Sequence, residues 1–311
     1  MDFTFNTFSF CSLTAAFALA PLFMGVILKV KAFFGGKQGP PWLIKYYTLI
    51  KLIRKGSVYS TSTTFVFKLG PIVSFVTGFM LLLFFPFAGL PPLLSFHGDV
   101  VILFYLLGLG RFFTVLAALD TASPFEGMGA AREVFFSVLS EATVFVILAL
   151  FFRLSGSLSF AEYFTGAHVV NLWSHSAVLI FLVLIALFIV LLTENSRIPV
   201  DDPATHLELT MIHEVMILDH SGPDLALIEM GAFCKLAFYA SFIACLLYPF
   251  HTGSSVINVI VFMAVMTLIY AAVGLVESIT ARCKMDMVPN FILTSFALVF
   301  FAVILTMEFV Q

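Results

Sequence analysis

The residues best suited to chemistry lie in one acidic stretch, from Glu194 to Asp224, between two long apolar segments. This stretch contains three histidines, one arginine (Arg197) and seven carboxylates: Glu194, Asp201, Asp202, Glu208, Glu214, Asp219 and Asp224. Elsewhere the chain avoids charge, since only 11% of all residues are charged. Carboxylates and histidines this dense beside a membrane segment can bind cations, relay protons or dock another subunit.

Further ionisable groups fall inside the apolar segments themselves: Arg111, Glu141, Glu229, Lys235 and Glu277. Such groups are costly in a bilayer and usually face a cavity, a bundle interior or a charged partner. Glu141 is expected about two turns inside its helix, where burial would favour its protonated form and suit it to carry a proton. The alternative is a buried ion pair with Arg111 that only holds two helices together. Glu229 and Lys235 are six residues apart, on roughly opposite helix faces, and should have different partners.

The whole chain is apolar enough to be a membrane protein. Of its 311 residues, 61% are hydrophobic and 39 are Phe, and the mean hydropathy is +1.10. A soluble chain of this length could not bury so much apolar surface. Runs of about 20 apolar residues can cross a bilayer as helices. They predict an all-α polytopic fold in a single membrane domain over residues 1–311, with eight spans near 8–28, 69–90, 99–119, 134–153, 175–193, 225–248, 256–276 and 288–309.

The positive charges lie in alternate loops. Seven of the 15 Lys and Arg residues fall between Lys29 and Lys55. The other loop cations are Lys68, Arg132, Arg197, Arg282 and Lys284. Eight spans place all of these loops on one side, whereas loops 91–98 and 249–255 have no Lys or Arg. The positive-inside rule therefore predicts that the basic and acidic loops are cytoplasmic and that both termini lie outside.

The cysteines and histidines do not predict a metal site. The four cysteines, at positions 11, 234, 245 and 283, form no CxxC pair, and an iron–sulfur or structural zinc site needs clustered thiolates. His206, His213 and His220 are spaced by seven, which on a helix separates successive side chains by about 10 Å, too far for one ion. Interfacial or proton-handling roles fit these histidines better.

The first cytoplasmic loop combines a tight turn with an amphipathic segment. The turn, over residues 35–41, is too rich in Gly and Pro for a regular helix. Apolar residues then recur at helical spacing over residues 42–53, with Lys and Arg elsewhere on the wheel, which predicts a helix in the membrane interface. It could anchor the chain to lipid, or it could cover a cavity or dock a partner.

The sequence also predicts the local structure of two more cytoplasmic segments. Residues 119–133 are polar and punctuated by Gly and Pro, as in a solvated loop. In the acidic stretch, Pro199 and Pro203 break the preceding helix. A new helix is expected from Ala204 to about Asp219, capped by Asp201 or Asp202.

The acidic stretch resembles the signature loop of the complex I subunit 1 family. Residues 193–203 read T-E-N-S-R-I-P-V-D-D-P, followed by L-E-L at 207–209; the family pattern is A-E-T-N-R-x-P-F-D-x-P-E, then E-x-E-L. The turn G-K-Q-G-P at residues 36–40 resembles the family's G-R-x-G-P. Within the family, D-T-A-S-P-F at 120–125, G-A-A-R-E at 129–133 and Glu277 with Arg282 are more similar to the hydrogenase branch. That branch comprises the membrane anchors of formate hydrogenlyase, hydrogenase 4 and related energy-converting hydrogenases.

The resemblance implies a noncatalytic membrane subunit that joins a peripheral redox arm, [NiFe]-hydrogenase-like or quinone-reducing, to antiporter-like membrane subunits. It also implies a prokaryotic inner (plasma) membrane. Iron–sulfur and nickel–iron centres would lie on partner subunits, and nucleic acid is not an expected partner. A quinone could bind, although Ala204 and His206 stand where the quinone branch usually has acids.

The family's proposed coupling path gives roles to particular residues, and no residue is expected to be catalytic. Ion coupling or proton relay is expected of Glu141, Glu194, Asp201, Asp202, Glu208, Glu214, Lys235 and Glu277. Charge pairing is expected of Arg111, Arg132, Arg197 and Arg282. The residues expected to dock another subunit are Gly36, Lys37, Gly39 and Pro40.

The function predicted from the sequence is therefore to link a redox arm to proton or sodium translocation. A quinone-binding subunit of a complex I-like NADH dehydrogenase is one alternative. A stand-alone ion transporter is another; it would favour a discontinuous span, for which Gly108 and Gly110 are the best candidates. A purely structural anchor without an ion path is the third.

Overall fold

The structure is a computed structural model that describes residues 7–165, 170, 177–202, 211–248 and 255–309. Within these ranges eight helices are long and apolar enough to cross a membrane, which confirms the predicted all-α polytopic fold. They are α1 (Thr7–Phe34), α3 (Phe65–Phe84), α4 (Asp99–Asp120), α5 (Pro124–Ser155), α7 (Ala177–Glu194), α9 (Pro223–Leu247), α10 (Ser255–Ile279) and α11 (Val288–Phe309).

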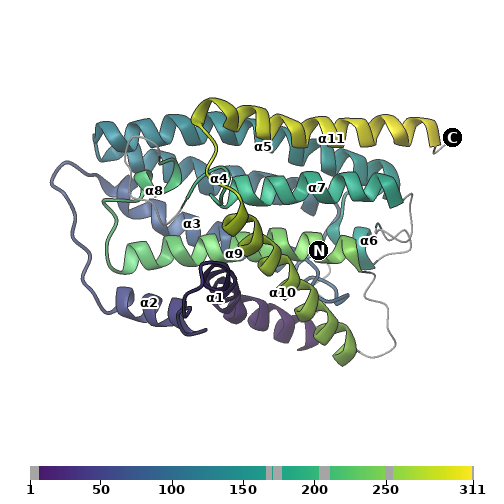
Figure 1. Cartoon of the computed structure of the whole chain (residues 1–311), viewed down its shortest axis with the longest axis horizontal. Coiled ribbons are helices and arrows are strands. Elements are labelled where there is room, and N and C mark those ends of the chain that lie inside the picture. Colours follow the sequence, from purple (N-terminus) through teal and green to yellow (C-terminus); the bar gives the residue numbers. More distant parts are fainter. Residues whose placement is uncertain (1–6, 166–169, 171–176, 203–210, 249–254, 310–311) are drawn as a thin grey trace.

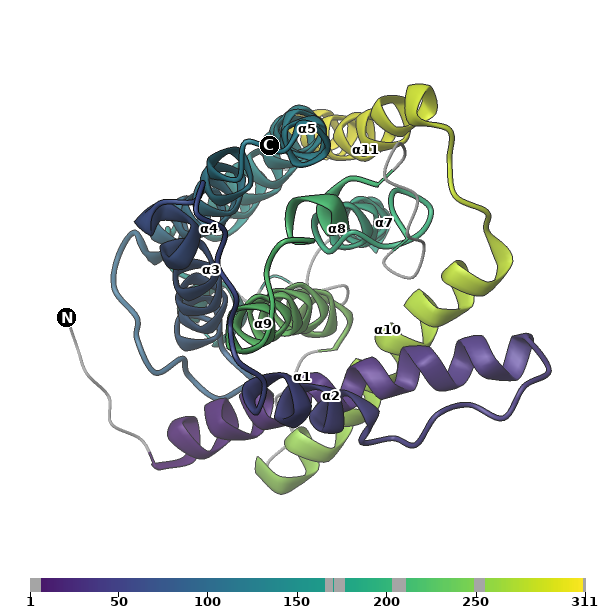
Figure 2. The ribbon, with the colours of Figure 1, turned by 90° about the vertical axis from the view of Figure 1, so that its left-hand side faces the viewer.

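Helix α9 forms the centre of the bundle. It is 78% buried over its most apolar window, more than any other described span. Viewed from the end of the bundle, α9 and α7 lie inside a ring formed by α1, α3, α4, α5, α11 and α10 (Figure 2). Helix α3 approaches α9 through two glycines: a Cβ on Gly78 would lie only 2.7 Å from the carbonyl oxygen of Gly231. Charged residues on α9 therefore project into the protein interior.

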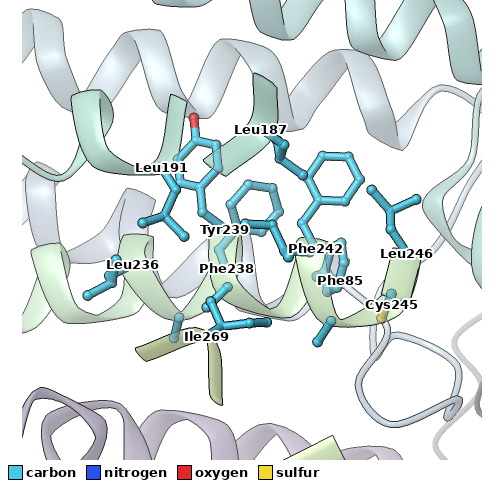
Figure 3. Close-up of a cluster of buried hydrophobic side chains, with 14 of the residues drawn as sticks. Phe85, Leu187, Leu191, Leu236, Phe238, Tyr239, Phe242, Cys245, Leu246 and Ile269 are labelled. Carbon is cyan, nitrogen blue, oxygen red and sulfur yellow. The ribbon is translucent and has the colours of Figure 1, made fainter. Parts of the chain in front are cut away.

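The half of α9 nearer its C-terminal end is held in an aromatic core. Phe238 and Phe242 of α9 contact Phe85, which follows α3, at ring-centroid distances of 5.3 and 5.8 Å (Figure 3). Aromatic pairs at these separations contribute about 0.5–1.5 kcal/mol each beyond burial. This core fixes the axis about which the polar residues of α9 are oriented.

Shorter elements lie at the two ends of the bundle. Helix α2 (Ile44–Ile53), helix α8 (His213–Met216) and the 3₁₀ helix η1 (Met285–Met287) are connected to the loops predicted to be cytoplasmic. Helix α6 (Phe160–Thr165) and the C-terminal end of α11 lie at the opposite end (Figure 1). Both the basic first loop and the described part of the acidic stretch are therefore at one end.

Two predicted boundaries are wrong. Helix α5 begins at Pro124, ten residues before the predicted start, because Pro is well tolerated at the first helical position and Glu126 favours the N-terminal end. Residues 124–133 are therefore helical rather than a solvated loop. The helix expected up to Asp219 exists in the described residues only as α8, while residues 203–210 lie outside the described ranges.

Candidate functional site

Arg111 and four other charged side chains, contributed by four helices in all, meet in one cluster. Arg111 of α4 binds Glu194 at the end of α7 through two hydrogen bonds of 2.7 and 2.6 Å. It also pairs with Glu141 of α5, and its Nε lies 3.7 Å from Glu133 Oε1. Lys235 of α9 approaches Glu194 to 3.5 Å. We refer to these residues as the Arg111 cluster.

The Arg111 cluster is short of one positive charge. Its three carboxylates face two cations, so the fully ionised cluster carries a charge of −1. Buried net charge is costly, and one proton shared among the carboxylates would neutralise the cluster. A proton bound in this way belongs to the coupled group rather than to one residue.

The carboxylates differ in how far their side chains are exposed to solvent. The Glu194 side chain is 3% exposed and also accepts a hydrogen bond from Ser140. The Glu141 side chain is 31% exposed, which places it at the margin of the cluster. Glu141 is therefore paired with Arg111, as the structural alternative predicted, and is also less buried than a sealed ion pair.

A small cavity with several charged groups in its wall adjoins the cluster. It has a volume of about 80 Å³ and is lined by Arg111, Glu133, Glu194, His213 and Lys235 among others. About 10–15 Å³ of such space is enough for one water molecule, so this cavity is large enough to hold water. Waters there would connect the charged groups by short proton-transfer steps.

A larger cavity of about 420 Å³ lies on the other side of the segment that follows α7. Its apolar wall includes Met24, Ile27, Phe233 and Leu236. Its charged lining consists of Lys31, Lys45, Arg197, Glu214, Glu229 and Glu277. The two cavities share Asn195, Ser196, His213, Ile228 and Ala232, so they are separated by little more than these residues.

Two ion-pair groups line the larger cavity. Glu277 of α10 binds Arg197 at 3.3 Å and Lys31 of α1 at 2.9 Å. Lys45 of α2 lies 3.8 Å from Glu229 of α9. Glu229 and Lys235 thus have different partners, as their spacing predicted.

A third ion pair, whose residues do not line the larger cavity, connects Asp201 to Arg282 at 2.8 Å. Asp201 also accepts hydrogen bonds of 3.1 Å from the backbone N–H groups of Ile212 and His213. These bonds satisfy two N–H groups at the start of α8, whereas the cap predicted for a helix from Ala204 falls on residues outside the described ranges. Burial raises the pKa of Asp201. Arg282 and the backbone N–H groups of His213, Ile212 and Asp202 act in the opposite direction.

Two adjacent residues of α8 have strongly shifted pKa values. Burial, together with the charges of Asp201 and Glu229, raises the pKa of Glu214 to about 7. Burial and the nearby Lys235 lower the pKa of His213 to about 4. Near neutral pH, Glu214 can therefore exchange a proton whereas His213 is uncharged.

The other predicted site residues lie apart from the Arg111 cluster. Arg132 donates to the carbonyl oxygen of Met211. Asp202 donates its backbone N–H to Asp201, and Glu208 lies outside the described residues.

The predicted docking residues form an exposed turn after α1. Gly36 has a φ of +62°, which glycine adopts without strain. The Gly39 carbonyl accepts from Lys29 at 3.2 Å.

The sequence did not predict two members of the polar interior. Glu133 was quoted only as part of a motif, because it was expected in a loop. Tyr239 follows Lys235 by one helical turn, and Figure 3 shows its hydroxyl directed away from the apolar core. That hydroxyl is buried without a hydrogen-bond partner among the described residues and interacts with the charges of Glu194, Arg111 and Glu141. The four-residue spacing from Lys235 was the available signal.

The transporter signature is absent from α4. This helix is continuous from Asp99 to Asp120, and Gly110 allows close packing, since a Cβ there would lie 2.5 Å from the Thr77 hydroxyl. The glycines of this span therefore serve helix packing rather than a break in the helix.

Comparison with known proteins gives a consistent family. The model of the NADH dehydrogenase family matches residues 7–308. Hydrogenase-4 component C of Escherichia coli (strain K12) is 29% identical over 90% of this chain and 89% of its own length. Formate hydrogenlyase subunit 4 of the same organism is 26% identical, covering 92% and 94%. NADH-ubiquinone oxidoreductase chain 1 of Arabidopsis thaliana is 25% identical, covering 70% and 69%.

A solved structure agrees with the fold. A chain of the membrane-bound sulfane sulfur reductase, an archaeal respiratory membrane complex, superposes with a TM-score of 0.80 at 18% identity, covering 96% of this chain and 97% of that chain. The superposition shows the same fold, and the family match together with the hydrogenase 4 and formate hydrogenlyase relatives shows a membrane subunit of the respiratory-complex type. The chain belongs to the NADH dehydrogenase family, within which it is similar to the hydrogenase 4 and formate hydrogenlyase subunits and to NADH-ubiquinone oxidoreductase chain 1.

Proposed function

We propose that this chain couples electron transfer in an attached redox arm to proton translocation. The observation that carries the proposal is the Arg111 cluster, in which three carboxylates share two cations beside a cavity large enough for water. Such a cluster can take up and release one proton, and its net charge then changes only between −1 and 0.

The proposed path begins at the larger cavity, near the loops predicted to be cytoplasmic. Glu214, with a pKa of about 7, would accept protons there. The smaller cavity would then pass them to Glu194, and Arg111 would hold Glu194 and Glu141 at opposite ends of its guanidinium. Glu141, the more exposed of the two, would deliver the proton to a neighbouring membrane subunit.

A proton is favoured over a sodium ion. A sodium ion needs several free oxygen ligands, and the cluster carboxylates are already engaged by Arg111, Lys235 and Ser140. Within the described ranges, no group of three or more metal-ligating side chains is arranged to hold an ion. Gain or loss of a proton needs no such cage.

The similarity to hydrogenase 4 and formate hydrogenlyase subunits supports a [NiFe]-hydrogenase-like arm as the partner. It also supports the inner membrane as the location. We place antiporter-like subunits beside α4 and α5 because Glu141, the most exposed end of the proposed path, lies on α5. Mild-detergent affinity purification of the tagged chain, followed by mass spectrometry, tests this. A large subunit with both CxxC nickel-ligand pairs is expected; a chain that purifies alone would contradict the proposal.

A quinone-type ligand is the second candidate function, favoured by the size of the larger cavity. A volume of about 420 Å³ lies in the range of small-molecule sites, and Arg197 and Lys31 could donate hydrogen bonds to a carbonyl oxygen. Binding of a soluble quinone analogue to the purified complex would be weakened by Arg197→Leu; unchanged binding would exclude this cavity.

A further inference from the structure

His213 lies at the boundary between the two cavities. It lines the smaller cavity together with Arg111, Glu133, Glu194 and Lys235, and the larger one together with Glu214, Glu229 and Arg197. Among the described residues that the cavities share, it is the only one with a titratable side chain. It is half-buried rather than sealed, in keeping with its place on two cavity walls.

We propose that His213 transfers protons between the two cavities as a neutral imidazole. This inference rests on the proposed function and names the residue that joins its two halves. A neutral imidazole has one N–H donor and one acceptor nitrogen. It can accept a proton on the second nitrogen from one cavity while releasing the first proton into the other. The ring is left as the other tautomer, and rotation of the ring about its Cβ–Cγ bond restores the starting arrangement for the next proton; no electrons move.

The surroundings of His213 favour this mode over storage of a positive charge. Lys235 of α9 and Arg111 of α4 disfavour the imidazolium, and Asp201 favours it. Burial also disfavours the imidazolium and has the largest effect. Together these effects lower the pKa of His213 to about 4. An imidazolium would therefore exist only as a short-lived intermediate, so a proton that enters from Glu214 is passed on to the Arg111 cluster.

The backbone of His213 is held in place by a hydrogen bond. The His213 N–H donates to Asp201, which Arg282 holds from the loop after α10. His213 is the first residue of α8. The residue therefore stays at the partition while its side chain remains free to exchange protons.

The test compares His213→Ala with His220→Ala in the intact complex. His220 is a buried histidine of the same segment that stacks on Phe67 and lines neither cavity. We expect His213→Ala to slow proton transfer by about a hundredfold, the scale of a lost acid–base group. We also expect added imidazole, which fits the larger cavity, to restore it. His220→Ala should translocate normally and not respond to imidazole.

Nitrogen-15 NMR of histidine-labelled complex gives a readout independent of activity, with the His213 signal assigned by its loss in His213→Gln. The expected result is a neutral ring exchanging tautomers between pH 7 and pH 5. An imidazolium at pH 6, or a single fixed tautomer, would overturn the proposal. So would a loss in His213→Ala that imidazole does not restore, or no loss at all.

The Glu194→Gln variant separates this inference from the proposed function. If Glu194→Gln abolishes translocation and His213→Ala does not, only the role of His213 fails. If Glu194→Gln translocates normally, the proposed function fails with it.

Discussion

At the scale of single residues, Arg111 is the side chain that most stabilises the polar interior. It neutralises charge on three carboxylates from two helices, and it lies nine residues, about 14 Å, from the end of α4. The sequence offered its pairing with Glu141 as the alternative to a proton-carrying role, because an intramembrane Arg and Glu need partners. It did not predict Glu194 as the principal partner, since Glu194 was assigned to the loop signature.

Replacing Arg111 with Leu should destabilise the folded chain by about 3–5 kcal/mol, because three carboxylates lose their main cation. Thermal unfolding of the purified protein in detergent measures this. Arg153→Leu is the matched control: Arg153 is exposed in the last turn of α5, and its loss should change the midpoint little. Equal midpoints for the two variants would contradict the role of Arg111.

Glu214 should give the site a pH dependence. Its pKa in the folded protein is raised from an ordinary value of 4.5 to about 7, so the folded state binds this proton more tightly than the unfolded state. The stabilisation is complete below about pH 4.5 and is lost as the pH rises through 7. Glu214→Gln should remove this slope from a plot of unfolding temperature against pH. It should also remove an infrared carboxylic-acid band that titrates near pH 7; a band that persists would assign the proton elsewhere.

At the scale of helices, the close crossing of α3 and α9 positions Lys235 and Glu229. A Cβ on Gly231 would lie 2.7 Å from the backbone oxygen of Ser74, so this crossing requires glycine. The spans were predictable because a 20-residue apolar run is a strong signal. The early start of α5 was missed because its Gly residues were given more weight than Pro124 at the first helical position.

Gly231→Ala should lower stability by about 1–3 kcal/mol through overpacking. Gly127→Ala is the control, since a Cβ there would meet no atom within 4 Å and alanine favours the helix. The unfolding midpoint should fall for Gly231→Ala and hold or rise for Gly127→Ala. A rise for both would show that α3 and α9 are farther apart.

At the scale of the whole molecule, the bundle brings charged residues from distant parts of the sequence onto one path. The family resemblance and the acidic stretch identified Glu194, Asp201, Glu214 and Glu277 as candidates. The cavities and the position of His213 between them depend on how α1, α2, α8 and α9 pack, and no sequence spacing encodes that packing. The shared cavity wall could therefore be found only from the three-dimensional arrangement.

The most direct test is proton translocation per electron by membrane vesicles that contain the complex with Glu141→Gln. Glu162→Gln, an exposed residue of α6 at the opposite end, is the control. Assembly should be intact in both, because Arg111 keeps Glu194 and Glu133 as partners. We expect electron transfer without translocation in Glu141→Gln and normal coupling in the control. Full translocation by Glu141→Gln would contradict the account.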